Sequence, residues 1–312
     1  MQIREATEQD IPEILDVLKA SLGETSSKKT ETVWRYKHVD NPFGESLVLV
    51  AVENDKIIGV RALMRWQWKK GEKIYSALRA VDTATHPEHQ GKGIFKKLTL
   101  KAIEISQENG DTFIFNTPNH QSLPGYLKMD WKEVEKLKIR VELANPLNWF
   151  NNEISKSYIV NNGCTKDQLF SLVLNYNALK AGENNLFTLK SPEYLLWRYE
   201  NNPLQKYEVK ADQDFYLAGY IKEHKLFKEL RITEHIFYED SGLQKLNKAL
   251  KEFSDKFSPQ IITSSGLNSG LGISGNYGPV LTLRDVNLDP VSKQELLLLN
   301  NWSYTLGDLE LF

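Results

Sequence analysis

The segment Thr85-His86-Pro87-Glu88-His89-Gln90-Gly91-Lys92-Gly93-Ile94-Phe95 is the most informative part of this 312-residue sequence. A predicted strand ends at its start, Pro87 stops further pairing, and Gly91 and Gly93 precede a predicted helix. At such a turn several backbone N–H groups and the positive end of the helix dipole point at one spot, which suits a phosphate group. Lysines within and just after the segment can add positive charge there.

The regions around this segment carry alternating helix and strand patterns. Residues 11–22 and 94–109 have apolar side chains at helical spacing, whereas residues 47–52 form an unbroken apolar run that indicates a strand buried on both faces. Further strands are expected at residues 3–6, 56–64, 75–85 and 112–115. The first half is therefore predicted to be a mixed α/β layer around one sheet.

The second half of the chain repeats part of the first. Trp34-Arg35-Tyr36 and Trp197-Arg198-Tyr199 are each followed by an Asn-Pro pair and a strand-like segment. Strand and helix patterns then follow in the same order in both halves, although a chance similarity between aromatic-rich segments is the alternative. We predict two related domains, residues 1–145 and 146–312, each a mixed, mostly antiparallel sheet flanked by helices. Both aromatic motifs are assigned a packing or inter-domain role.

Composition limits the classes of function. Hydrophobic residues make up 41%, and 39 Lys+Arg face 41 Asp+Glu, so no overall positive field would gather nucleic acid. A single cysteine, Cys164, excludes an internal disulfide and a zinc site built from several thiolates. No signal peptide and no uncharged run of about 18 residues is found, so we expect a cytoplasmic protein with no membrane partner.

The glycine-rich turn resembles a known family motif. Gln90-Gly91-Lys92-Gly93-Ile94-Phe95 is similar to the acyl-CoA loop of the GNAT N-acetyltransferases, although Phe95 stands where most members have Gly or Ala. Asn119 precedes the segment Tyr126-Leu127-Lys128-Met129-Asp130-Trp131 at the family spacing, with Asp130 in place of Gly. The resemblance covers about residues 1–142, and the whole chain looks like the tandem-domain branch of this superfamily, with a degenerate second domain.

The resemblance implies acetyl-CoA as co-substrate and a primary amine of a small molecule or sugar as acceptor, which attacks directly in a ternary complex. A backbone N–H of the strand before the loop would meet the thioester carbonyl oxygen, because a splayed strand leaves such a donor free. The residues expected to bind the cofactor are Thr83, Ala84, Thr85, Gln90, Gly91, Lys92, Gly93, Ile94, Phe95, Asn119 and Ser122.

Two residues are candidates for proton transfer. Tyr126 is expected to act as the general acid toward the CoA sulfur, because a phenol with a pKa near 10 suits protonation of a thiolate. Asp82 is the candidate base because it lies on the strand before the loop, but a carboxylate that only pairs with Arg79 or Arg35 is an equal alternative. The nearby histidines lack metal-ligand spacing, so no metal is expected.

Other readings remain open at this level. One is a non-catalytic acyl-CoA-binding protein, and another is an aminoacyl transferase of the kind that extends peptidoglycan peptides. The second half lacks the glycine loop and has Glu239 and Asp240 at the corresponding place, where two carboxylates would repel a pyrophosphate. An amino sugar, a peptide, a polyamine or an antibiotic amine would each fit as the acceptor, and the oligomeric state cannot be read.

Overall fold

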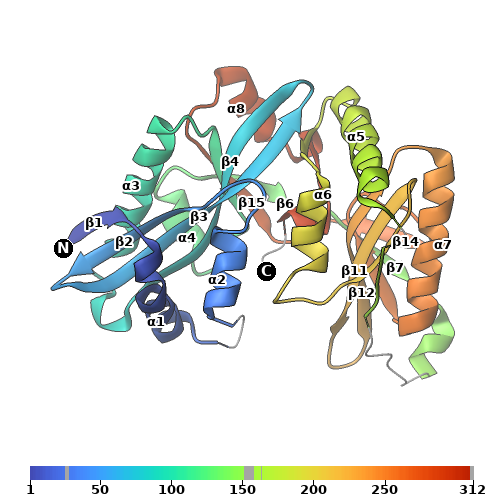
Figure 1. Cartoon of the computed structure of the whole chain (residues 1–312), viewed down its shortest axis with the longest axis horizontal. Coiled ribbons are helices and arrows are strands. Elements are labelled where there is room, and N and C mark those ends of the chain that lie inside the picture. Colours follow the sequence, from blue (N-terminus) through green and yellow to red (C-terminus); the bar gives the residue numbers. More distant parts are fainter. Residues whose placement is uncertain (25–27, 151–157, 163, 310–312) are drawn as a thin grey trace.

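Two sheets lie side by side with helices on their faces (Figure 1). The computed structural model describes residues 1–24, 28–150, 158–162 and 164–309. Within this part of the chain, no helix combines the length and the apolar character needed to cross a membrane. The prediction of a mixed α/β fold with two sheets flanked by helices is confirmed.

The first sheet contains the strands expected in the first half of the chain. Its main path runs β1 (Gln2–Glu5), β2 (Leu47–Glu53), β3 (Lys56–Lys70), β4 (Lys73–Thr85), β5 (Phe113–Asn116), β15 (Val280–Asp285) and β6 (Lys132–Lys136). Along this path every pair is antiparallel except β4 and β5, which are parallel. Two short strands extend the sheet on one side: β9 (Leu186–Thr188) pairs with β3 and with β16 (Trp302–Ser303).

Helices cover both faces of this sheet, because its central strands have apolar side chains on both sides. Val50 on β2 faces the core that includes α1 (Ile11–Leu22), whereas its neighbours Leu49 and Ala51 face the core that includes α3 (Ile94–Glu108). The expected burial of residues 47–52 on both faces is thus confirmed. The shorter helices here are α2 (Glu31–His38) and α4 (Leu123–Leu127).

The second sheet has a related arrangement. Its order is β14 (Gly272–Gly275), β7 (Ile139–Leu143), β13 (Ile261–Ser264), β12 (Lys228–Phe237), β11 (Phe215–Glu223), β10 (Glu208–Ala211) and β8 (Val160–Asn162). A long antiparallel hairpin of β11 and β12 is followed by the helix α7 (Asp240–Phe257) and by β13, which pairs in parallel with β12. The same succession of hairpin, helix and parallel strand occurs in β3, β4, α3 and β5.

The remaining helices belong to the second half of the chain. They are α5 (Lys166–Gly182), α6 (Pro192–Leu195), a π-helical turn (Leu196–Glu200), α7 (Asp240–Phe257), α8 (Pro290–Leu296) and α9 (Leu306–Leu309). Short 3-10 helices span Glu8–Asp10, Pro87–His89, Pro146–Phe150 and Leu299–Asn301.

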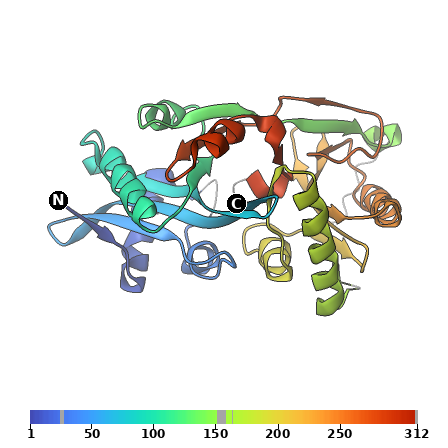
Figure 2. The ribbon, with the colours of Figure 1, turned by 90° about the horizontal axis from the view of Figure 1, so that it is seen from above.

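The two sheets exchange strands across the middle of the chain (Figures 1 and 2). β7 precedes residue 145 but lies in the second sheet, between β14 and β13. β15 comes from the second half but lies between β5 and β6, with Leu283 opposite Phe115. The division into residues 1–145 and 146–312 therefore stays a prediction about folding units, and the sheets themselves do not divide there.

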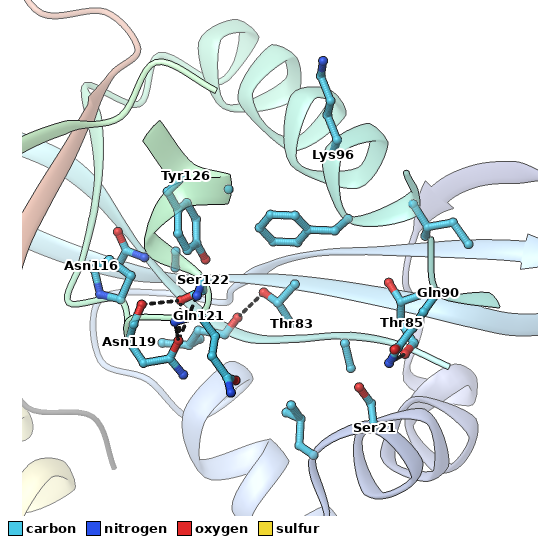
Figure 3. Close-up of a pocket in the computed structure, with 18 of the residues that line it drawn as sticks. Ser21, Thr83, Thr85, Gln90, Lys96, Asn116, Asn119, Gln121, Ser122 and Tyr126 are labelled. Atoms are coloured by element: carbon cyan, nitrogen blue, oxygen red, sulfur yellow. Dashed lines mark hydrogen bonds between the residues drawn. The ribbon is translucent and has the colours of Figure 1, made fainter. Parts of the chain in front are cut away.

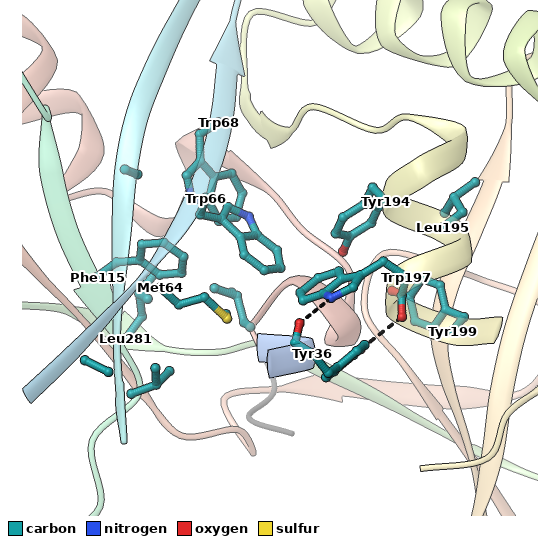
Figure 4. Packing of buried hydrophobic residues seen from close by; sticks show 14 of the residues in the cluster. Tyr36, Met64, Trp66, Trp68, Phe115, Tyr194, Leu195, Trp197, Tyr199 and Leu281 are labelled. Carbon is teal, nitrogen blue, oxygen red and sulfur yellow. Dashed lines mark hydrogen bonds between the residues drawn. The ribbon is translucent and has the colours of Figure 1, made fainter. Parts of the chain in front are cut away.

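An aromatic cluster joins the two halves (Figure 4). The rings of Tyr36 and Trp197 stack with their centroids 5.0 Å apart. The Tyr36 hydroxyl donates to the Trp197 carbonyl at 3.0 Å, and the Trp197 indole N–H donates to the Tyr36 carbonyl at 2.7 Å. The repeated Trp-Arg-Tyr motifs thus meet each other, which confirms their predicted packing role.

Candidate functional site

A cavity of about 970 Å³ opens where the two parallel strands of the first sheet separate (Figure 3). β4 and β5 pair only from Ala77 to Arg79 on β4 and from Phe113 to Phe115 on β5. Farther along, the end of β4 forms one wall and the segment after β5 forms the other. The start of α3, the helix α4 and the end of α1 complete the lining, to which Pro279 contributes from the second half.

This cavity brings together most of the residues predicted from the sequence. All of them except Asp82 and Lys92 line it, namely Thr83, Ala84, Thr85, Gln90, Gly91, Gly93, Ile94, Phe95, Asn119, Ser122 and Tyr126. Lys92 instead lies beside His89, with its Nζ 3.3 Å from the His89 Nδ1. Lys96, in the first turn of α3, is the lysine that lines the cavity.

A β-bulge shapes the wall formed by β4. Thr83 pairs with Arg61 and Val81 pairs with Ala62, so that Asp82 is the extra residue and has a φ of 26°. Val81 and Thr83 line the cavity on either side of the bulge, whereas Asp82 does not. A bulge interrupts the ladder of backbone hydrogen bonds, which is the condition for a free N–H donor on this wall.

The Asp82 carboxylate is held away from the cavity by two groups of α2. It pairs with the Lys37 ammonium group, and its Oδ2 lies 2.9 Å from the His38 Nε2. Burial would raise the pKa of Asp82, but the charge of Lys37 and the hydrogen bond from His38 outweigh it and hold this pKa far below its usual range. Neither Arg79 nor Arg35, the partners considered from the sequence, contacts it. The arrangement is that of a structural ion pair.

The glycine-rich turn has the conformation that its sequence predicts. Gly91 and Gly93 have φ values of 77° and 73°, and a Cβ at either position would meet no atom within 4 Å. The left-handed backbone by itself accounts for glycine at both positions. The first backbone bond of α3 runs from the Lys97 N–H to the Gly93 carbonyl at 3.1 Å, so the preceding N–H groups are free for an anion. No acidic residue lies in this first turn.

Asn119 organises the opposite wall. Its Oδ1 accepts from the backbone N–H groups of Gln121 and Ser122 at 3.1 and 2.9 Å, and from the Ser122 hydroxyl at 3.0 Å. Because these three hydrogen bonds occupy Oδ1, the Asn119 side chain can offer a ligand only its amide N–H₂ group, as a donor. Asn119 and Ser122, both expected to bind the cofactor, are thus joined in one turn of this wall.

The Tyr126 hydroxyl reaches the cavity from α4 (Figure 3). A buried arginine, Arg61, contacts this hydroxyl. The Arg61 Nη1 donates to the Tyr126 Oη at 2.7 Å and to the Thr83 Oγ1 at 2.7 Å. The Phe95 ring meets the Tyr126 ring edge-on, with centroids 5.6 Å apart. The Phe95 ring also packs beside Gly125, where an added Cβ would lie at the ordinary contact distance of 3.4 Å from the ring.

Sequence reasoning missed three of the residues that shape this site. Arg61 is a charged residue within an apolar strand, and that contrast was the signal that could have identified it. Lys37 and His38, which bind the Asp82 carboxylate, come from a helix that was read only as an aromatic motif. Their role depends on how α2 packs against β4, which no local pattern reveals.

The second half has a closed counterpart of the glycine-rich turn. The helix α7 begins after Glu239 and has Asp240 in its first turn, as the sequence indicated. A Cβ at Gly242 would lie 2.4 Å from the Asp214 carbonyl oxygen, so the backbone at residue 214 packs closely against the first turn of α7. The charges of Glu239 and Asp240 oppose pyrophosphate binding there.

Beside the first-half turn, the side chains of His86, Glu88 and His89 come together. Their potential ligand atoms lie within 4.8 Å of one another, although the sequence spacing had not suggested a metal site. The His89 Nδ1 also lies 3.4 Å from Glu53 and 3.3 Å from the Lys92 ammonium. This nearby positive charge opposes a cation, and no role is assigned to the cluster.

Comparison with known proteins identifies the fold. Residues 2–134 match the family model described as an acetyltransferase (GNAT) domain. A probable N-acyltransferase from Enterococcus faecalis superposes with a TM-score of 0.68 at 10% identity, over 92% of this chain and 73% of that one. A GCN5-related N-acetyltransferase from Kribbella flavida gives 0.64 at 11% identity, over 92% and 71%. No curated protein sequence matches the chain.

A further solved structure superposes over most of the chain. Eis1 from Mycobacterium abscessus superposes with a TM-score of 0.58 at 13% identity, over 95% of this chain and 75% of that one. The class defined by the fold is thus that of the acetyltransferase-like α/β proteins. Residues 2–134 are accordingly assigned to a GNAT acetyltransferase domain.

Proposed function

We propose that the protein transfers an acetyl group from acetyl-CoA to a primary amine of a small molecule. The observation that carries this proposal is the cavity between the separated ends of β4 and β5. Its lining combines an anion-binding helix start, a bulged strand and the Tyr126 hydroxyl. With about 970 Å³, it is at the upper end of the usual range for ligand cavities.

Each part of the cavity has a role in this proposal. The free N–H groups at the start of α3, with Lys96 beside them, would bind the pyrophosphate of CoA. A backbone N–H of the segment Thr83-Ala84-Thr85 would donate to the thioester oxygen, and the Asn119 amide would donate to the pantetheine arm. Tyr126 would supply the proton that the departing sulfur needs.

The proposed step balances without further reactants. The amine nitrogen attacks the carbonyl carbon, a C–N bond forms, and the C–S bond breaks. The Tyr126 O–H proton passes to the sulfur, and the phenol regains a proton from solvent. In the described part of the chain no carboxylate lines the cavity. The acceptor is therefore proposed to enter as a neutral primary amine and to release one of its two N–H protons to solvent when the amide forms.

The test is a shift in melting temperature with acetyl-CoA, CoA and longer acyl-CoAs. Ligand at about 100 times its dissociation constant should add about 2.7 kcal/mol to the stability of the fold that binds it. Gly93→Asp should abolish the shift, because it strains a left-handed position and puts a carboxylate at the phosphate site. Gly110→Asp is the matched control, since Gly110 lies at the other end of α3 with a φ of 76° and open space around it.

Thiol release in the presence of amines then separates an enzyme from a binding protein. Amino sugars, polyamines, peptides and antibiotic amines form the panel. Acetyl-CoA-dependent release with at least one class supports acetyl transfer. A melting shift without release under any condition would favour the non-catalytic acyl-CoA-binding alternative, and the lack of any shift would overturn the assignment of the cavity.

A further inference from the structure

Arg61 is a buried cation directly beneath the cavity. Its side chain is fully buried in the middle of β3. No carboxylate of the described residues lies within ion-pairing distance of it, and its Nε and Nη2 have no hydrogen-bond partner there. A buried cation that is not paired with a carboxylate destabilises the folded state, so its presence indicates a function other than stability.

Two aromatic rings surround the guanidinium group. Its central carbon lies 5.3 Å from the centroid of the Tyr126 ring and 5.7 Å from that of Phe95. Ring faces attract a cation, and this partly compensates for the missing carboxylate. The same packing fixes the guanidinium group, and with it the Nη1 that contacts the Tyr126 Oη.

Among the described residues, the hydrogen bonds around Arg61 leave the Tyr126 hydroxyl proton without an acceptor. Arg61 can only donate, so both the Tyr126 and the Thr83 oxygens act as acceptors toward it. The Thr83 hydroxyl proton is used, because it is donated to the Val81 carbonyl at 2.9 Å. The Tyr126 hydroxyl has no acceptor in the described part of the chain, and it points toward the middle of the cavity (Figure 3).

We propose that Arg61 is the positioning residue that makes Tyr126 a proton donor into the cavity. By occupying a lone pair of the phenol oxygen, it leaves the O–H hydrogen to the ligand. After transfer of that proton to sulfur, the phenolate oxygen lies 2.7 Å from a permanent cation. This inference rests on the proposed function, because it assumes that the ligand presents a sulfur atom to Tyr126.

A double-mutant cycle on kcat tests this. Tyr126→Phe should lower kcat by about 10²-fold, as loss of a general acid does. Arg61→Gln should lower kcat by a similar factor with little change in KM for acetyl-CoA, and Arg61→Lys should recover part of it. Because Arg61 acts through Tyr126, Arg61→Gln should have no further effect on kcat in the Tyr126→Phe background.

Arg79→Gln is the matched control for this cycle. Arg79 is as fully buried on the neighbouring strand β4, but it donates to the carbonyl groups of Asp308 and Leu309 and not to Tyr126. In the double variant with Tyr126→Phe, the fold-losses in kcat of Arg79→Gln and Tyr126→Phe should multiply. If the fold-losses of Arg61→Gln and Tyr126→Phe also multiply in their double variant, Arg61 acts independently of Tyr126 and the inference is overturned.

A binding measurement keeps the test independent of turnover. CoA should bind more tightly than desulfo-CoA, which lacks the sulfur atom, by about fivefold, as one hydrogen bond provides. Both Tyr126→Phe and Arg61→Gln should reduce this ratio toward one, and Arg61→Lys serves if the Gln variant does not fold. If the preference for CoA over desulfo-CoA is lost in Tyr126→Phe but kept in the Arg61 variants, the inference is overturned. If the wild type releases no thiol, only the proposed function is contradicted.

Discussion

At the scale of single residues, Asp82 shows how one backbone irregularity removes a side chain from a site. Its neighbours Val81 and Thr83 line the cavity, but as the bulged residue it turns toward α2 and meets Lys37 and His38. A carboxylate with a strongly lowered pKa is a weak base. The geometry therefore favours the structural alternative for Asp82, with partners other than those the sequence suggested.

Asp82→Asn should lower the free energy of unfolding by about 3 kcal/mol, because buried Lys37 then loses its carboxylate partner. Urea unfolding measures this loss, and it should be smaller in the double variant with Lys37→Met. The two single variants should lower kcat by similar factors, since both break the same ion pair. A loss of kcat in Asp82→Asn about 10²-fold beyond that in Lys37→Met would instead identify Asp82 as the base.

At the scale of elements, the position of α3 depends on a glycine in the strand beneath it. A Cβ at Gly59 on β3 would lie 2.8 Å from the Ile94 Cγ2 and 3.3 Å from the Leu98 Cδ1. Ile94 is the first residue of α3 and is buried, so it cannot swing aside. The glycine thus lets the helix start approach the sheet and places its N–H groups at the cavity.

Gly59→Ala should destabilise the protein by about 2 kcal/mol through overpacking, although alanine is otherwise favoured over glycine within a strand. It should also weaken the melting shift with acetyl-CoA, because the start of α3 is pushed outward. Gly182→Ala in α5 is the control, since nothing lies within 4 Å of its added Cβ. Equal stability of the two variants in urea unfolding would contradict this account of α3.

At the scale of the whole molecule, a buried charge cluster lies between the two sheets. Lys190 pairs with Glu234 of β12 at 2.7 Å and with Asp308 of α9 at 2.5 Å, and all three side chains are buried. Hydroxyl groups of Tyr199 and Tyr194 donate to the same two carboxylates. Burial, with the added charge of Asp308, raises the pKa of Glu234 to about 7 despite the opposing effect of Lys190.

This raised pKa predicts that stability falls as pH rises from about 4.5 to about 7, because only the folded state keeps the Glu234 proton in that interval. Glu234→Gln has no such proton. It should therefore match the wild type at pH 5 and gain on it by up to about 3 kcal/mol at pH 8, as urea unfolding at each pH would measure.

Glu229→Gln on the same strand is the control for this prediction. Burial opposes ionisation of Glu229, but Arg231, Thr263 and His224 outweigh it and lower the pKa. The stability difference between Glu229→Gln and the wild type should stay level from pH 5 to pH 8. A level difference for Glu234→Gln as well would show that Glu234 is ionised throughout this range.

Local patterns predicted the main strands and the two longest helices of the first half and most of the candidate site, but they did not predict α2, α5 or β15. Residues 11–22 and 94–109 form the predicted helices with ends within one residue, and the glycines at 91 and 93 have the backbone that their turn requires. These features follow from apolar periodicity and from backbone sterics, which act over a few residues. The same holds for Asn119 and Ser122, which lie in one turn.

The sequence by itself determined most elements of the first half, the phosphate-type turn and the place of Tyr126 near it. Only the tertiary structure decided that β15 joins the first sheet and β7 the second, that Asp82 is neutralised from α2, and that Arg61 lies under Tyr126. The physical reason is that strand partners, ion pairs and buried cations depend on contacts between segments far apart in the chain. Such contacts leave no periodic trace in the sequence.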